Sequence, residues 1–296
     1  MGRLLFWCFA FTFFLTSCAH FRPTSRIHHQ RSEVSQSIFQ AFTRIQVVRS
    51  YDILVCSEID TSVCRSVVQM SKASGFGSGG VIRHGENTSE ILTAAHVVDE
   101  FDQLSPVTPE ATEGFLLEFA RVSGMSQPEL MYRLREGHLK IVGLKTVVYV
   151  VASDGNSYKV KSLNCDSNSD ACIVQTGKID DVEPLSLSSD APQIGDTVLI
   201  ASGPFGYGIP GMMVPIFEGI YSGETPDGKD YYTLQVVPGS SGSLIVNRDG
   251  DIVGIVSMFI TGSFCPGRLG CQVLPSGVMV SVPLSIIHGL VHPSGE

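Results

Sequence analysis

The chain contains the run Gly239-Ser240-Ser241-Gly242-Ser243, a G-x-S-G-S pattern between two apolar stretches at 231–237 and 244–246. Glycines on both sides of Ser241 let the backbone approach a bound molecule closely, and they allow dihedral angles that a Cβ would forbid. A serine hydroxyl is a weak nucleophile by itself and needs a base within hydrogen-bond reach. The pattern therefore predicts a tight loop that presents Ser241 between two strands, with a basic partner elsewhere in the chain.

The best-placed base is His96, far upstream of this loop. It follows the apolar run Ile91-Leu92-Thr93-Ala94-Ala95, and the other seven of the eight histidines have no comparable context. The sequence has no C-x-x-C or H-E-x-x-H spacing, so we expect neither a structural zinc nor a metalloprotease site.

These residues resemble the trypsin-like serine proteases, and most closely their bacterial HtrA-type branch. In that family the histidine stands in a T-A-A-H stretch, the serine stands in a G-x-S-G turn, and the order along the chain is His, Asp, Ser. Subtilisin-type and α/β-hydrolase enzymes place the same groups in other orders. The resemblance covers residues from about 45 to 292, through the glycine-rich run at 75–82, the turn at 201–206 and the strand at 254–257.

The resemblance also places an aspartate at the head of an apolar strand between His96 and Ser241. Asp170 fits because it opens the run Asp170-Ala171-Cys172-Ile173-Val174. An expected hairpin with an Asp154-Gly155 turn precedes it, as in the HtrA-type branch. Asp166 is the alternative, although it lies four positions earlier and lacks an apolar strand directly after it.

The fold that the resemblance implies is all-β, with two six-stranded antiparallel β-barrels and a short C-terminal helix. The first barrel, at about 45–177, carries His96 and Asp170, and the second, at about 185–282, carries Ser241. Composition agrees, because 30 glycines and 15 prolines scattered between short apolar runs are typical of an all-β domain with many turns. We therefore expect the site in the cleft between two barrels.

The implied activity is that of a serine endopeptidase acting on protein or peptide substrates without a cofactor. His96 takes the proton of Ser241 as its oxygen attacks a peptide carbonyl, and Asp170 orients the imidazole. The backbone N–H groups of Gly239 and Ser241 form the oxyanion hole. Two alternatives keep the same fold: a catalytically silent pseudoprotease that acts as a binding module, and an esterase that uses the same triad.

Four residues are expected at substrate-binding positions, namely Gln235, Ser257, Met258 and Phe259. Gln235 stands six positions before Ser241, where trypsin-type pockets carry an aspartate, so a basic P1 side chain finds no counter-charge. Phe259 stands where trypsin-like chains have a glycine, and its ring would narrow the entrance to the pocket. We therefore expect a small apolar P1 residue.

The separation between His96 and Asp170 is long for the HtrA-type branch, which indicates a helical insertion in the first barrel at about 103–140. A capping box at Ser126-Gln127-Pro128-Glu129 predicts the start of a helix, and Gly137 predicts its end. Since the chain ends shortly after the expected terminal helix, we expect a protease domain at 45–292 and no PDZ domain.

Residues 1–17 are expected to be a signal peptide of the lipoprotein type. Arg3 precedes the apolar run at 4–15, which is too short for a membrane span. Leu15-Thr16-Ser17-Cys18 then resembles a bacterial lipobox, in which Cys18 is lipidated; simple cleavage after Ala19 is the alternative. Ala19 lacks the acidic character that marks inner-membrane retention. We expect an outer-membrane lipoprotein that faces the periplasm, with 18–44 as tether and N-terminal segment and a flexible stretch from 19 to about 36.

Of the eight cysteines, Cys8 lies in the expected signal peptide and Cys18 is the candidate for lipidation. The remaining six are an even number, which fits disulfide bonds in an oxidising compartment. Cys56/Cys64 and Cys265/Cys271 bracket short loops that a local disulfide can close, which leaves Cys165/Cys172 as the third pair. Six cysteines allow fifteen pairings, so the connectivity stays open, and buried free thiols, Cys172 first among them, are the alternative. The formal net charge of −9 argues against nonspecific binding of nucleic acid, for which a basic stripe is expected.

Overall fold

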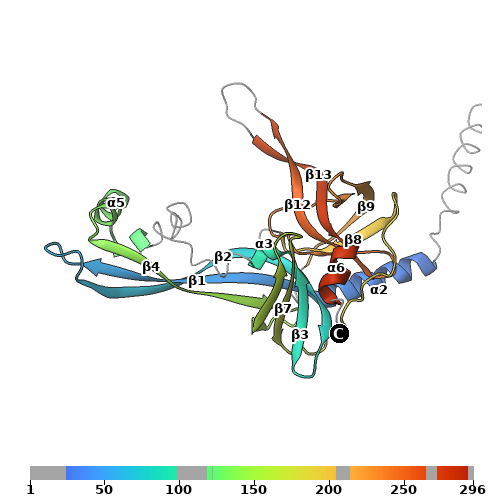
Figure 1. Ribbon diagram of the computed structural model, residues 1–296, viewed down its shortest axis with the longest axis horizontal. Helices are drawn as coiled ribbons and strands as arrows, with labels where there is room; N and C mark the ends of the chain where they lie inside the picture. The colour runs from blue at the N-terminus through green and yellow to red at the C-terminus, as the bar shows by residue number, and fades with distance from the viewer. Residues whose placement is uncertain (1–24, 99–118, 122, 205–213, 265–271, 293–296) are drawn as a thin grey trace, which may run out of the picture.

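The computed structural model describes residues 25–98, 119–121, 123–204, 214–264 and 272–292. Strands dominate it and form two units (Figure 1). The first unit is a seven-stranded sheet with the order β5-β4-β1-β2-β3-β7-β6, and the second is a closed barrel with the order β10-β13-β12-β11-β8-β9. The all-β, two-barrel fold predicted from the sequence is confirmed.

The first unit is built from long and short strands that all pair antiparallel: β1 (Phe42–Cys56), β2 (Cys64–His84), β3 (Thr88–Thr93), β4 (Leu139–Val151), β5 (Ser157–Lys159), β6 (Ser162–Asp166) and β7 (Ala171–Gly177). Strands β5 and β6 lie at opposite edges of the sheet, yet only two residues separate them. Those two residues make hydrogen bonds to strands near the two edges of the sheet. Val160 N donates to Val148 O of β4 at 3.0 Å, and Lys161 N donates to Gln175 O of β7 at 2.8 Å. One bent segment therefore joins the two edges, and counting it once gives the expected six strands.

The second unit contains β8 (Thr197–Ala201), β9 (Ile216–Glu224), β10 (Asp230–Thr233), β11 (Leu244–Val246), β12 (Ile252–Phe264) and β13 (Gln272–Pro283). Its interior is filled by side chains such as Ile200, Tyr232, Leu234 and Met279, each at most 2% exposed. All three residues of β11 are buried, so the strand after the serine loop is anchored in the barrel core.

Strands β1, β2 and β4 continue beyond the first unit as a three-stranded arm (Figure 1). Its tip carries the helix α5 (Gln127–Arg135), capped by Ser126, whose Oγ accepts a hydrogen bond from Glu129 N at 3.4 Å. Leu130 of this helix packs with Ile53, Phe119 and Leu139 in a small separate core. The helix and cap expected at 126–137 are confirmed, while residues 103–118 and 122 of the expected insertion lie outside the described residues.

The expectation of a flexible tether needs correction where the chain is described. Residues Ser25–Ala41 form the helix α2, and Val34, Ile38 and Ala41 are buried against the core that both units share. Their spacing of four and three residues puts them on one helical face, and burial of that face stabilises the helix.

The C-terminal helix α6 (Leu284–Val291) is present as expected and buries Leu284, Ile287 and Val291. The expected signal peptide and Cys18 lie outside the described residues. Among the helices that the structure describes, none combines the length and apolarity needed to cross a membrane.

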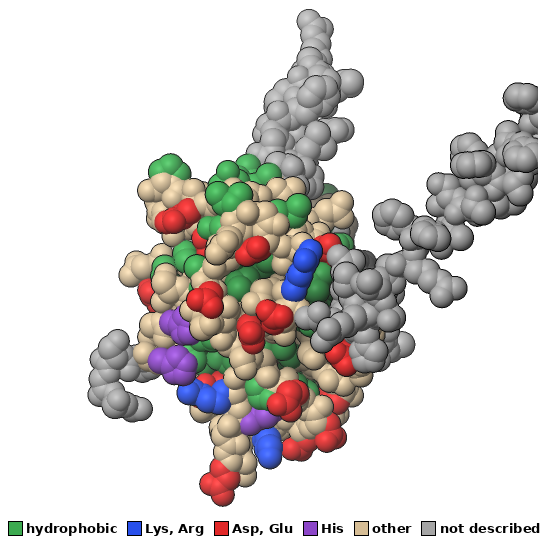
Figure 2. Space-filling model, turned by 90° about the vertical axis from the view of Figure 1, so that its right-hand side faces the viewer, with side chains coloured by type: hydrophobic (Ala, Val, Ile, Leu, Met, Phe, Trp, Pro, Cys, Tyr) green, Lys and Arg blue, Asp and Glu red, His purple; other side chains and the backbone are tan. Residues whose placement is uncertain are grey.

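The acidic balance of the sequence is visible on the surface. Figure 2 shows one face on which Asp and Glu side chains are scattered between apolar and neutral polar ones, with fewer Lys and Arg side chains. This face carries part of the acidic excess that gives the chain its net charge of −9.

Candidate active site

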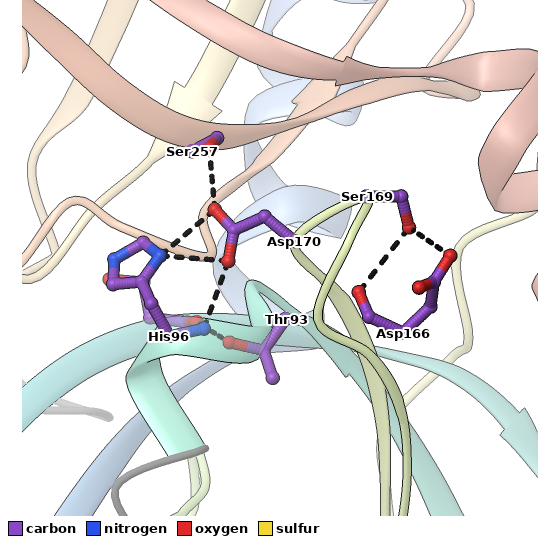
Figure 3. Close-up of polar contacts among 7 residues, drawn as sticks. Thr93, His96, Asp166, Ser169, Asp170 and Ser257 are labelled. Carbon is purple, nitrogen blue, oxygen red and sulfur yellow. Dashed lines mark hydrogen bonds and ion pairs between the residues drawn. The ribbon is translucent and has the colours of Figure 1, made fainter.

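His96 and Asp170 are brought together by two neighbouring strands. His96 lies in the short helix α3 (Ala95–Val98) directly after β3, and Asp170 ends the turn before β7. Strands β3 and β7 pair with Thr93 opposite Cys172, which sets the two side chains side by side. His96 Nδ1 lies 2.9 Å from both carboxylate oxygens, and the backbone N of His96 donates to Asp170 Oδ1 at 2.9 Å (Figure 3).

The backbone of Asp170 adopts φ +61°, a left-handed conformation that aspartate tolerates better than most residues. Its carbonyl accepts a hydrogen bond from Ala95 N at 3.1 Å. Main chain and side chain of Asp170 are therefore both tied to the segment that carries His96.

Ser257 provides a third contact to this pair from the second unit. Its hydroxyl donates to Asp170 Oδ2 (Figure 3). Burial raises the pKa of Asp170, but the hydrogen bonds from the His96 ring, the Ser257 hydroxyl and the His96 backbone N–H outweigh burial and hold this pKa below its ordinary value. The carboxylate is therefore ionised at neutral pH.

Asp166, the alternative aspartate, makes local contacts instead. Its carboxylate accepts hydrogen bonds from Ser169 Oγ at 2.7 Å and from Asn168 N at 3.1 Å. Figure 3 shows it on the far side of the turn from His96. Of the two aspartates, Asp170 alone bonds to the His96 ring.

The serine loop has the glycine conformations that the sequence indicates. Gly239 has φ +95° and Gly242 has φ +83°. A Cβ at Gly242 would overlap the Ser78 carbonyl oxygen and the Thr93 hydroxyl, so this position accepts only glycine. The loop therefore packs directly against the end of β3, three residues before His96.

The three serines of the loop differ in their surroundings. Ser240 is 1% exposed, and its Oγ accepts hydrogen bonds from Ser202 Oγ at 2.7 Å and Val237 N at 3.2 Å. Ser243 is fully buried, and its Oγ has no hydrogen-bond partner within the described residues. Ser241 is half-buried, so it is the serine of this loop that reaches the surface.

Among the described residues, the Ser241 hydroxyl makes no hydrogen bond with the His96 ring. Such a bond is often long or poorly aligned in an unliganded enzyme and tightens when substrate binds. Within the same part of the chain, Gly239 N and Ser241 N also donate no hydrogen bond, while Ser240 N donates to Val237 O at 2.9 Å and Gly242 N to Val256 O at 2.7 Å. Two N–H groups of the loop are thus available to a bound molecule.

The four residues expected at substrate-binding positions differ in how far they are exposed. Gln235 and Met258 are exposed, whereas Ser257 is 4% exposed and is used by Asp170. Phe259 belongs to β12, and its side chain lies outside what the structure describes. Strand β12 pairs with β13 along one edge and with β11 along the other, but in the described ladders the pairing with β11 stops at Ile255. At Ser257 and Met258, the edge of β12 that faces away from β13 therefore has no strand partner in these ladders. The contact between Ser257 and Asp170 was missed from the sequence, because it joins residues of different units.

Two of the expected disulfides are present. Cys56–Cys64 closes the tip of the arm, and Cys165–Cys172 joins β6 to β7 beside Asp170. Cys172 is therefore not a free thiol, and the pair Cys265/Cys271 lies outside the described residues. Within the described part of the chain, no three His, Cys, Asp or Glu side chains gather in a way that would hold a metal ion.

Residues 77–255, more than half of the chain, match the family described as trypsin-like peptidase domain. A comparison with curated proteins gives no match. The matched range includes His96, Asp170 and Ser241.

Proposed function

Because the chain belongs to the trypsin-like peptidase family, we propose that it is a serine endopeptidase with Ser241, His96 and Asp170 as its triad. The observation that carries the proposal is the bond between the His96 ring and Asp170. Bonding of Nδ1 to a carboxylate leaves Nε2 as the proton acceptor and stabilises the charged ring that forms when it takes a proton.

The reaction follows from these positions. The Ser241 oxygen attacks a peptide carbonyl carbon while its proton passes to His96 Nε2, and the carbonyl oxygen becomes negatively charged. The N–H groups of Gly239 and Ser241 stabilise that charge. The carbon–nitrogen bond then breaks, His96 gives its proton to the leaving amine, and water hydrolyses the acyl-enzyme by the same steps.

The substrate backbone is proposed to lie along the free edge of β12 at Ser257 and Met258, as an added antiparallel strand. Gln235 supplies no negative charge for a basic P1 side chain, and we retain the expectation of a small apolar P1 residue such as Val or Ala. A cleavage profile of a peptide library dominated by Arg, Lys or Glu at P1 would contradict this specificity.

We propose that the chain belongs to the HtrA-type branch, and the β4–β5 hairpin, whose Asp-Gly turn precedes the turn of Asp170, supports this. We further propose export, with lipidation at Cys18 and anchoring to the outer membrane facing the periplasm. Two disulfides favour an oxidising compartment. Cys18→Ala should move the protein from the membrane fraction to the soluble periplasmic fraction, and a wild-type protein already soluble there would end the lipidation proposal.

The proposed activity is tested with casein and with matched peptide amide and ester substrates. Wild type and Ser243→Ala should cleave casein and the amide, and Ser241→Ala should cleave neither. Ser243→Ala is the matched control, because it removes a hydroxyl from the same loop that has no partner within the described residues. Hydrolysis of the ester alone would favour an esterase, and no hydrolysis at all would favour a pseudoprotease.

A further inference from the structure

Ser78 of β2 contacts the serine loop at two points, although 161 residues separate it from Gly239. Its backbone N donates to Ser241 O at 2.7 Å, and its hydroxyl donates to Gly239 O at 2.8 Å. Its carbonyl accepts a hydrogen bond from Thr93 Oγ1 at 2.7 Å. One residue therefore joins the loop of the second unit to the strand that leads to His96.

These contacts fix alternate peptide planes of the loop. The peptide from Gly239 to Ser240 is held by Ser78 at its carbonyl and by Val237 O at its N–H. The peptide from Ser241 to Gly242 is held by Ser78 at its carbonyl and by Val256 O at its N–H. The N–H of Ser241 lies in the peptide between these two, and the N–H of Gly239 lies in the peptide just before them. Because a peptide unit is planar, fixing its neighbours restricts where these two N–H groups point.

The hydroxyl of Ser78 is needed in both of its hydrogen-bonding roles. While it donates to Gly239 O, it accepts from Gly203 N at 3.2 Å. Ser78 is fully buried and Gly203 is buried, so water cannot easily replace the hydroxyl. An alanine at 78 keeps the backbone bond to Ser241 but leaves the Gly239 carbonyl and the Gly203 N–H without their partner, which is costly in a buried site.

We propose that Ser78 is a positioning residue that holds the Gly239 and Ser241 N–H groups in the orientation that receives the oxyanion. The catalytic role of Ser78 rests on the proposed function, whereas its effect on the conformation of the serine loop does not. Stabilisation by preorganised donors acts in the transition state, so a misplaced donor lowers kcat more than it raises KM.

The test compares full-length wild type with Ser78→Ala and with Ser89→Ala as the matched control. Ser89 is also a fully buried serine of the first unit, and its hydroxyl also has two partners, His84 Nδ1 at 2.8 Å and Ile179 N at 2.9 Å. Two readouts are taken: kcat and KM on a peptide amide per fluorophosphonate-titrated site, and hydrogen exchange of a peptide that covers 237–243.

We expect Ser78→Ala to lower kcat by about 10- to 100-fold, less than the roughly 100- to 1000-fold typical of losing a donor outright. KM should stay within about twofold, and exchange at 237–243 should become faster. Ser89→Ala should match wild type in both readouts. Should Ser78→Ala not fold, Ser78→Cys retains a weak donor and should change both readouts in the same direction by a smaller amount.

Unchanged kcat and unchanged exchange in the Ser78 variants would overturn the proposal, as would an equal loss of kcat in Ser89→Ala. A wild-type protein that cleaves nothing would contradict the proposed function. The exchange readout then decides the role of Ser78 alone: faster exchange at 237–243 in Ser78→Ala supports it, and unchanged exchange overturns it.

Discussion

The two units hold their parts of the site in opposite ways. In the first unit, the His96 ring and the Asp170 carboxylate are already bonded to each other, and a hydroxyl from the second unit adds to them. In the second unit, the serine loop keeps two N–H groups without a hydrogen bond among the described residues, while the peptides on either side of the Ser241 N–H are clamped. In the proposed mechanism, this difference means that the acid–base pair is assembled in advance, whereas the charge-stabilising donors are held open for an atom of the substrate.

The largest expected effect comes from removing the side chain of the proposed nucleophile in the second unit or that of the proposed base in the first. Ser241→Ala and His96→Ala should each lower kcat by about 10⁴- to 10⁶-fold, because the proposed triad acts as a unit. For the same reason, the double variant should lose no more than the worse single variant. Steady-state kinetics on one peptide amide measures all three, and a double variant whose loss equals the product of the single losses would show that the two residues act independently.

Asp170→Asn should have the next largest effect, a loss of about 10³- to 10⁴-fold in kcat, because an amide does not hold the required tautomer of His96. Asp166→Asn is the control, since it makes the same change four residues away, at a carboxylate that bonds to Ser169 and Asn168 and not to the His96 ring. We expect near wild-type activity from it. The reverse ranking of the two variants would transfer the role to Asp166.

The two disulfides sharpen the comparison on a smaller scale. They close loops of similar length, with sequence separations of 8 and 7, so loss of either should cost about 2–3 kcal/mol of stability in the chain-entropy account. Replacing Cys165 and Cys172 by serine should also lower kcat, because their bond joins the two strands that flank Asp170. Replacing Cys56 and Cys64 should not. Thermal melts and kinetics of both double variants check this, and equal effects on kcat would contradict it.

The sequence and the structure agree best where the chemistry is local. The glycines around Ser241, the run before His96 and the strand after Asp170 each leave a pattern within a few neighbouring residues. The partners Ser257 and Ser78 leave none, because their contacts join residues 87 and 161 positions apart and arise only when the two units meet. Helix α2 was missed for a related reason. Most of its residues are polar, and the burial of Val34 and Ile38 depends on a core formed by distant strands.

The smallest expected effect concerns the pH dependence of stability. The pKa of Asp170 is below its ordinary value of about 3.9, so its contribution is fully present above that pH and is lost as the pH falls through the lower folded-state pKa. Ser257→Ala removes one hydrogen bond that lowers this pKa, and it should narrow the gap between the folded and unfolded values. Urea unfolding at pH 6 and pH 3 should then show a smaller loss of stability on acidification in the variant. An equal loss in both proteins would show that Ser257 does not affect Asp170.

The central claim is that Ser241 is activated as the nucleophile, although Ser240 and Ser243 stand within two residues of it. Mass spectrometry of the protein after treatment with a fluorophosphonate tests this claim directly, because only an activated serine reacts. We predict one adduct, on Ser241, in wild type and in Ser243→Ala, and none in Ser241→Ala or His96→Ala. An adduct on another serine, or a Ser241→Ala variant that still cleaves casein, would contradict the account.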